Sequence, residues 1–156
     1  MRRFIIWILT HGIALAIGFA LGIYLLPILT APPSPDAEVL AESAEGAVYT
    51  AEIAEDLRGN DALHWGMGTI SLTATQVVHE GSLAPGPDYM VYLVPEFVEH
   101  EEEFAPLKDQ SIVLGSVKTF EGFMLDIPAG VDLEAYTTVL VWCEAFSQFI
   151  AAAEYR

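Results

Sequence analysis

The only cysteine of the chain, Cys143, follows Trp142 in the run "TTVLVWCEAF". A lone thiol is either a redox group or a small side chain that fills a core. In a β-strand, Cys143 would share one face with Val139 and Val141, and Trp142 and Leu140 would lie on the other. Both faces are apolar, which predicts a central strand and a buried thiol with a raised pKa. A core role is favoured; redox chemistry and haem or metal ligation by Cys143 stay open as alternatives.

A second group of reactive side chains lies in "PEFVEHEEEF", which we predict to be an acidic helix inserted between two strands. Its members are Glu96, Glu99, His100 and Glu103. Residues at this spacing share one face of a helix. Such a face could bind a divalent cation or dock a basic protein such as a soluble cytochrome. A solvated charged face is the simpler interpretation and the favoured one.

Two histidines, His11 and His64, are weaker candidates. His11 lies inside an apolar run, where histidines ligate haem or pigment or hydrogen-bond a neighbouring helix. No second ligand accompanies either histidine, and the chain has no Ser/His/Asp order, nucleotide-binding glycine loop or zinc spacing. We therefore expect no enzymatic activity and no cofactor held by this chain alone. A haem or pigment would belong to partner subunits.

The N-terminal run predicts a membrane-spanning helix. Residues 4–29, "FIIWILTHGIALAIGFALGIYLLPIL", carry no formal charge, and at about 1.5 Å per residue they exceed the ~30 Å hydrocarbon core. A cleaved signal peptide is the alternative, but its apolar region would be shorter. Arg2 and Arg3 place residues 1–3 in the cytoplasm by the positive-inside rule. The expected location is the inner membrane, with a single span and a periplasmic C-terminal domain.

This helix carries small residues on two faces. Small residues let helices approach closely in lipid, so the helix could pack between two integral membrane subunits. The two series are Gly12, Ala16 and Ala20, and Ala14, Gly18 and Gly22. Their abundance could also reflect only the ordinary composition of membrane spans.

The exported part is strongly acidic. After residue 30 it has 22 acidic and four basic residues, a balance of −18. This charge disfavours nucleic acid and anionic lipid as partners and favours basic proteins or divalent cations. Solubility alone is the simpler explanation of the charge. With one cysteine, no internal disulfide can form.

The remaining sequence predicts a linker and then a β-domain. Residues 30–56 begin with the proline-rich "TAPPSPDA", in which Ser34 could cap a helix, and continue as an Ala/Glu-rich helical segment interrupted at Gly46. From residue 57 the short runs "GTISLTATQVV", "YMVYLV", "SIVLGSV", "GFMLDIP" and "TTVLVWCEAF" alternate with turn residues. This pattern indicates an all-β, antiparallel sandwich or barrel over residues 57–156.

The segment Leu57–Arg156 resembles a DM13 domain. The matching pieces, in the family's order, are "GNDALHWGMGTISL", "GPDYMVYL", "LGSV", "IPAGVDLEAYTTVLVWC" and "FSQFIAAA". The resemblance implies a small extracytoplasmic β-module associated with electron transfer, in which Cys143 matches the family's cysteine, often next to haem-binding domains. The chain departs from the family in "FMLDIP", which lacks a tyrosine before Ile-Pro, and at Ile150 or Ala151, where the family tends to have glycine.

Three functions follow as expectations. The first is a non-enzymatic accessory or structural subunit of a membrane complex, respiratory or photosynthetic, that transports electrons. The second is a thiol-based electron carrier that uses Cys143. The third is an acidic module that binds a cation or a basic protein.

Overall fold

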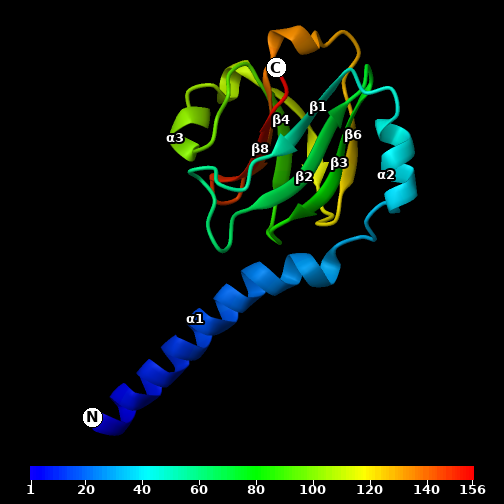
Figure 1. The fold of residues 1–156 in the computed structure, drawn as a ribbon. Helices are drawn as coiled ribbons and strands as arrows, with labels where there is room; N and C mark the ends of the chain where they lie inside the picture. The colour runs from blue at the N-terminus through cyan, green and yellow to red at the C-terminus, as the bar shows by residue number, and fades with distance from the viewer.

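A computed structural model describes all residues, 1–156 (Figure 1). A long N-terminal helix, α1 (Arg2–Thr30), precedes a short helix, α2 (Ala37–Ala44), and a β-sandwich. The strands are β1 (Tyr49–Ile53), β2 (Gly66–Leu72), β3 (Gln76–Leu83), β4 (Tyr89–Val94), β5 (Ile112–Val117), β6 (Phe123–Asp126), β7 (Thr138–Cys143) and β8 (Gln148–Glu154). A third helix, α3 (Glu101–Phe104), and two short 3-10 turns, Lys108–Gln110 and Leu133–Ala135, lie in loops.

The strands form two antiparallel sheets of four strands each, in the orders β1-β2-β3-β6 and β5-β4-β7-β8. This arrangement confirms the predicted all-β sandwich. Most of the predicted strand runs became strands, except that "GTISLTATQVV" supplies parts of two strands joined by a turn. The structure adds β8, an alanine-rich strand that the sequence pattern did not identify.

Strand β7 is buried along its whole length, on both faces. Cys143, Val139 and Val141 belong to the core between the two sheets. Leu140 and Trp142 belong to a second apolar cluster, which the loop with α3 covers on the outer face of the sheet. The predicted central strand with two apolar faces is therefore confirmed.

The two sheets approach most closely where their facing residues are small. A Cβ atom added to Gly66 in β2 would lie 2.5 Å from the Cβ of Ala151 in β8. Atoms cannot approach that closely, so glycine at 66 and alanine at 151 bring the two sheets together. The methyl group of Ala151 therefore leaves no room for a side chain at position 66.

The prediction of helix through residues 37–57 is wrong in its second half. Helix α2 starts after Asp36 rather than Ser34 and ends at Ala44, and Gly46 turns the chain with φ +78°. Tyr49–Ile53 then forms strand β1, paired antiparallel with β2. The β-branched and aromatic residues of "VYTAEI" fit a pleated surface, and pairing with an exposed sheet edge outweighs the helix propensity of alanine and glutamate.

The predicted acidic helix over residues 95–104 is also wrong in most of its length, because α3 has only four residues. Val98 and Phe104 are both fully buried against the outer cluster. Six residues apart, they would point about 120° away from each other on one continuous helix. The chain therefore stays irregular before His100, and Glu96, Glu99 and His100 do not share a helical face with Glu103.

Helix α1 has the length and composition of a membrane-spanning helix, and none of its hydrophobic window is buried. A helix of this kind near an N-terminus is either a membrane anchor or a signal sequence. Its C-terminal half runs beneath one end of the sandwich, and its N-terminal half extends away (Figure 1). Ile23 and Pro27 are the helix residues that the domain partly covers.

The buried His79 in β3 generates the first prediction. Its Nε2 donates to the Met67 carbonyl at 3.0 Å, and its Nδ1 has no partner. Burial lowers the pKa of His79 below its usual range near 6.5, so the folded protein resists proton uptake that the unfolded chain accepts. The stability that neutral His79 supports is complete above that range and is lost as pH falls through it.

We expect His79→Gln to weaken this loss between about pH 7.5 and pH 5, because the amide can donate to Met67 but takes up no proton. Thermal unfolding of the detergent-solubilised chain across this range measures the effect. The unmodified chain, measured in the same detergent and over the same pH range, is the reference. Equal pH dependence in His79→Gln and the unmodified chain would contradict the prediction.

Candidate functional site

Cys143 lies at the end of the sandwich that faces α1, which we call the base. The base is formed by residues 61–65 and by the loops 84–88, 118–122 and 144–147. A cavity of about 390 Å³, the thiol cavity, lies here between the sandwich and α1. Cys143, Tyr89, His64 and Phe146 line it from the domain, and Tyr24 lines it from the helix.

The thiol is buried at the end of β7. Cys143 is only 3% exposed, between Tyr89 of β4 and Gln148 of β8. Its Sγ–H donates to the Pro87 carbonyl, 3.1 Å away. Burial raises the pKa of the thiol, and the charges of Asp88 and Glu144 act in the same direction. At neutral pH Cys143 is therefore a protonated, hydrogen-bonded thiol, as its apolar strand predicted.

The polar groups around the thiol cavity already have partners within the chain. The Tyr89 hydroxyl donates to the Ala84 carbonyl at 2.9 Å, and burial raises its pKa. His64 Nδ1 lies 3.0 Å from Asp61, whose carboxylate also accepts from the backbone N–H of Leu63. The hydrogen bond from His64 lowers the pKa of Asp61. These contacts hold the loops of the base in place. No side chain that could take a proton from the thiol is in hydrogen-bond contact with it.

A polar network on the outer face of the same sheet was missed in the sequence. The Tyr92 hydroxyl donates to Glu144, and Lys108 Nζ lies 2.6 Å from the same carboxylate. Burial works to raise the pKa of Glu144, but the hydrogen bonds from Lys108 and Tyr92 outweigh it and lower the pKa. Lys108 also lies 5.8 Å from the ring centroid of Trp142. Lys108 could have been singled out in the sequence because basic residues are rare in the domain: only four follow residue 30.

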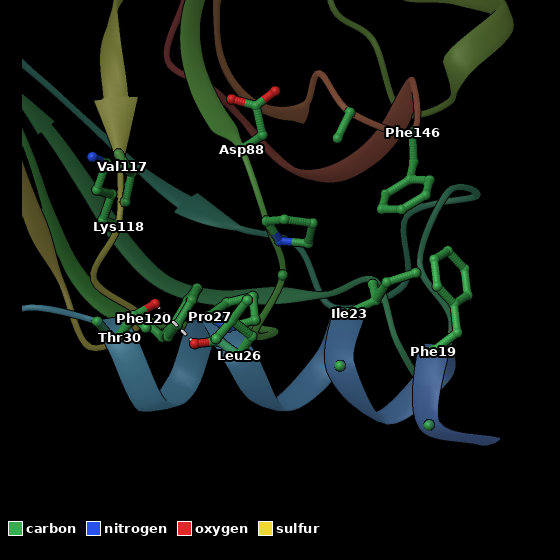
Figure 2. Close-up of a pocket in the computed structure, with 16 residues that line it drawn as sticks. Phe19, Ile23, Leu26, Pro27, Thr30, Asp88, Val117, Lys118, Phe120 and Phe146 are labelled. Carbon is green, nitrogen blue, oxygen red and sulfur yellow. Dashed lines mark hydrogen bonds between the residues drawn. The ribbon is translucent and has the colours of Figure 1, made fainter. Parts of the chain in front are cut away.

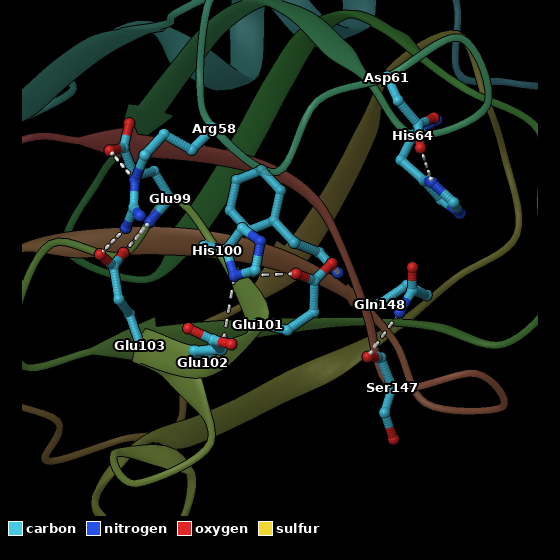
Figure 3. Close-up of polar contacts among 11 residues, drawn as sticks. Arg58, Asp61, His64, Glu99, His100, Glu101, Glu102, Glu103, Ser147 and Gln148 are labelled. Carbon is cyan, nitrogen blue, oxygen red and sulfur yellow. Dashed lines mark hydrogen bonds and ion pairs between the residues drawn. The ribbon is translucent and has the colours of Figure 1, made fainter.

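The acidic residues of the predicted docking face are turned largely toward the chain itself (Figure 3). Arg58 Nε lies 2.7 Å from Glu99, and the same guanidinium pairs with Glu103. His100 Nδ1 lies 3.2 Å from Glu101, which also accepts from the backbone N–H of Phe149. Glu96 lies apart from this network and is exposed. No group of three or more His, Cys, Asp or Glu side chains is arranged to hold a metal ion.

The small residues of α1 divide between two environments. Gly18, Gly22 and Ala20 line the cavities between α1 and the base, beneath the chain's own domain. Gly12, Ala14 and Ala16 lie farther toward the N-terminus and are exposed.

His11 lies in the N-terminal half of α1. Its ring stacks on Trp7, with ring centroids 3.8 Å apart, and its Nδ1 donates to the Trp7 carbonyl at 2.9 Å. Nε2 remains as the free acceptor of this histidine.

The comparison with protein families agrees with the architecture of the β-domain. A family model described as "Electron transfer DM13" matches residues 57–155. The match covers the segment in which the sequence motifs resembled this family. No match was found among curated proteins or among solved structures.

The buried thiol generates the second prediction. We expect a maleimide to label Cys143 in the folded chain roughly a hundredfold more slowly at neutral pH than in denaturant, because labelling requires local opening and a thiolate. The control is Ser116→Cys in a Cys143→Ala background, which places a thiol on an exposed edge-strand position. Rapid labelling of folded Cys143, close to that of the control, would contradict the buried site.

Substitution of the same residue tests its role in packing. Cys143→Ala removes the sulfur and its hydrogen bond, and we expect it to cost about 1–2 kcal/mol of unfolding free energy. Cys143→Ser provides the comparison, since its hydroxyl can still donate to the Pro87 carbonyl. Thermal unfolding of the three solubilised chains measures the difference, and an unchanged stability in Cys143→Ala would contradict the packing role.

Proposed function

The chain belongs to the DM13 family, and from this premise we propose that it is a membrane-anchored accessory subunit of an electron-transport complex, respiratory or photosynthetic. In this proposal α1 is an uncleaved anchor in the inner membrane, and the β-domain lies on the periplasmic side. The subunit is structural rather than enzymatic. Haem or pigment, where present, is held by the partner subunits.

The observation that carries the proposal is the burial of Cys143 as a protonated thiol, in a family described by electron transfer. A thiol of raised pKa with no second cysteine is a poor electron carrier by itself. The electron-transfer association is then best explained by redox groups on partners. The exposed small residues Gly12, Ala14 and Ala16 give α1 a surface on which partner helices could pack.

The charge of the domain supports a further part of this proposal. With a balance of −18 after residue 30, the domain would attract a basic protein such as a soluble cytochrome by long-range electrostatics. Because Arg58 already pairs with Glu99 and Glu103, we assign this attraction to the whole domain rather than to one docking face.

A thiol-based carrier is the second candidate function, and one observation favours it. Cys143 lines the thiol cavity, so a small electron acceptor that entered this space would meet the sulfur. If the thiol carries electrons, Cys143→Ser would abolish electron transfer in a stably folded protein. If Cys143 serves packing, the same variant would keep electron transfer in the assembled complex.

Packing of α1 against partner helices generates the third prediction. We expect Gly12→Leu and Ala16→Leu each to weaken co-purification of the chain with its membrane complex by about tenfold, because the larger side chain keeps helices apart. Gentle detergent extraction of native membranes, followed by size, absorption spectrum and identification of co-migrating chains, measures this. Ile13→Leu, which changes shape and not bulk at the neighbouring position, is the control.

The same extraction tests the proposal as a whole. Recovery in a large assembly with the absorption of haem or pigment supports an accessory subunit. A small colourless particle from the unmodified chain would contradict it, and normal co-purification of both leucine variants would contradict packing through these residues.

A further inference from the structure

A groove of about 920 Å³, the anchor groove, separates α1 from the base of the sandwich (Figure 2). Its volume lies within the range of small-molecule binding pockets. Helix residues such as Phe19, Ile23 and Leu26 face the domain residues Phe120 and Phe146 across it. Most of its lining is apolar, although it lies between two parts of the same chain.

The depth of the groove along α1 follows from the length of the helix. If Arg3 marks the cytoplasmic boundary, about 30 Å of hydrocarbon ends some 20 residues later, near Ile23. Tyr24, an aromatic residue of the kind that gathers at membrane interfaces, lies at this level. The Phe19 end of the groove then lies at the depth of acyl chains, and the end beside Thr30 and Lys118 lies at the level of headgroups.

The basic residue of the groove differs from the other basic residues of the domain. Asp88 and Lys118 are the two charged residues among its lining residues. Arg58 and Lys108 are paired with glutamates, and Arg156 donates to the Glu134 carbonyl. Lys118 alone among the basic residues after residue 30 has no hydrogen bond or ion pair, and the carboxylate of Asp88 also has none. One free cation and one free anion therefore lie on the groove.

We propose that the anchor groove holds an acyl chain of a zwitterionic phospholipid from the outer leaflet, with the lipid phosphate bound by Lys118 and its ammonium group near Asp88. The apolar residues from Phe19 to Phe146 contact the acyl chain. An anionic headgroup such as phosphatidylglycerol fits less well, because it has no ammonium group to place near Asp88 and its net negative charge would meet a domain with a charge balance of −18. This inference rests on α1 being a membrane anchor, as in the proposed function.

The test uses the full chain in phosphatidylcholine vesicles that contain phosphatidylcholine with a photoactivatable acyl chain. We expect cross-links on the domain peptides that contain Phe120 and Phe146. Gly22→Phe should reduce these domain cross-links about tenfold, since nothing lies within 4 Å of a Cβ there and the added ring occupies the groove. Gly12→Phe adds the same ring to α1 outside the groove and should leave them unchanged.

Two further arms test the headgroup. Lys118→Gln should lower the domain cross-links about fivefold, and Lys118→Arg should retain them. Replacement of the bulk lipid by phosphatidylglycerol should leave cross-linking by the phosphatidylcholine probe in place. Displacement of the probe by phosphatidylglycerol would overturn the zwitterionic assignment.

The outcomes separate this site from the proposed function. A chain that resists carbonate extraction from the vesicles, yet shows equal domain cross-links in Gly22→Phe and Gly12→Phe, overturns the lipid site and leaves the anchor standing. A chain that does not remain inserted overturns the anchor and the lipid site together. Loss of domain cross-links in Gly22→Phe alone, in an inserted chain, supports both.

Discussion

The fold depends on one strand that is apolar on both faces. Strand β7 contributes Val139, Val141 and Cys143 to the core between the sheets, and Leu140 and Trp142 to the outer cluster. An outer apolar face must be covered, which explains why the loop between β4 and β5 folds back over the sheet with Val98 and Phe104 as its anchors. The hydrogen bonds of Lys108 and Tyr92 to Glu144 then join this loop to the edge of the sheet.

Much of the β-domain could be predicted from local pattern, and the errors share one cause. Runs rich in valine, isoleucine and tyrosine, such as β4, were found because their propensity and their burial agree. Strands β1 and β8 were missed because alanine and glutamate favour helix locally, and only pairing with a neighbouring strand makes them extended. The acidic loop was misjudged for a related reason: its helical spacing of charges is real, but burial of Val98 and Phe104 decides its path.

The burial of Cys143 followed from its strand, but its surroundings did not. The position of Pro87, Tyr89 and Tyr24 around the thiol cavity depends on which loops meet at one end of a sandwich and on where α1 passes. These residues are far apart in sequence, and no local pattern encodes their arrangement. His79 was missed as well, because a histidine in an alternating strand reads as polar until the opposite sheet is placed over it.

The short connection between anchor and domain has a consequence for assembly. Six residues, 31–36, join α1 to α2, a reach of at most about 20 Å, and three of them are prolines. Since α2 packs beside β3 and the linker that precedes it is short and rich in proline, the freedom of the domain to turn about its helix is limited. The rotation of the helix about its own axis in the bilayer therefore determines which side of the domain faces a neighbouring subunit. Any partner that engages both parts must match them at one angle, and such two-point attachment gains avidity only where that match is geometrically allowed.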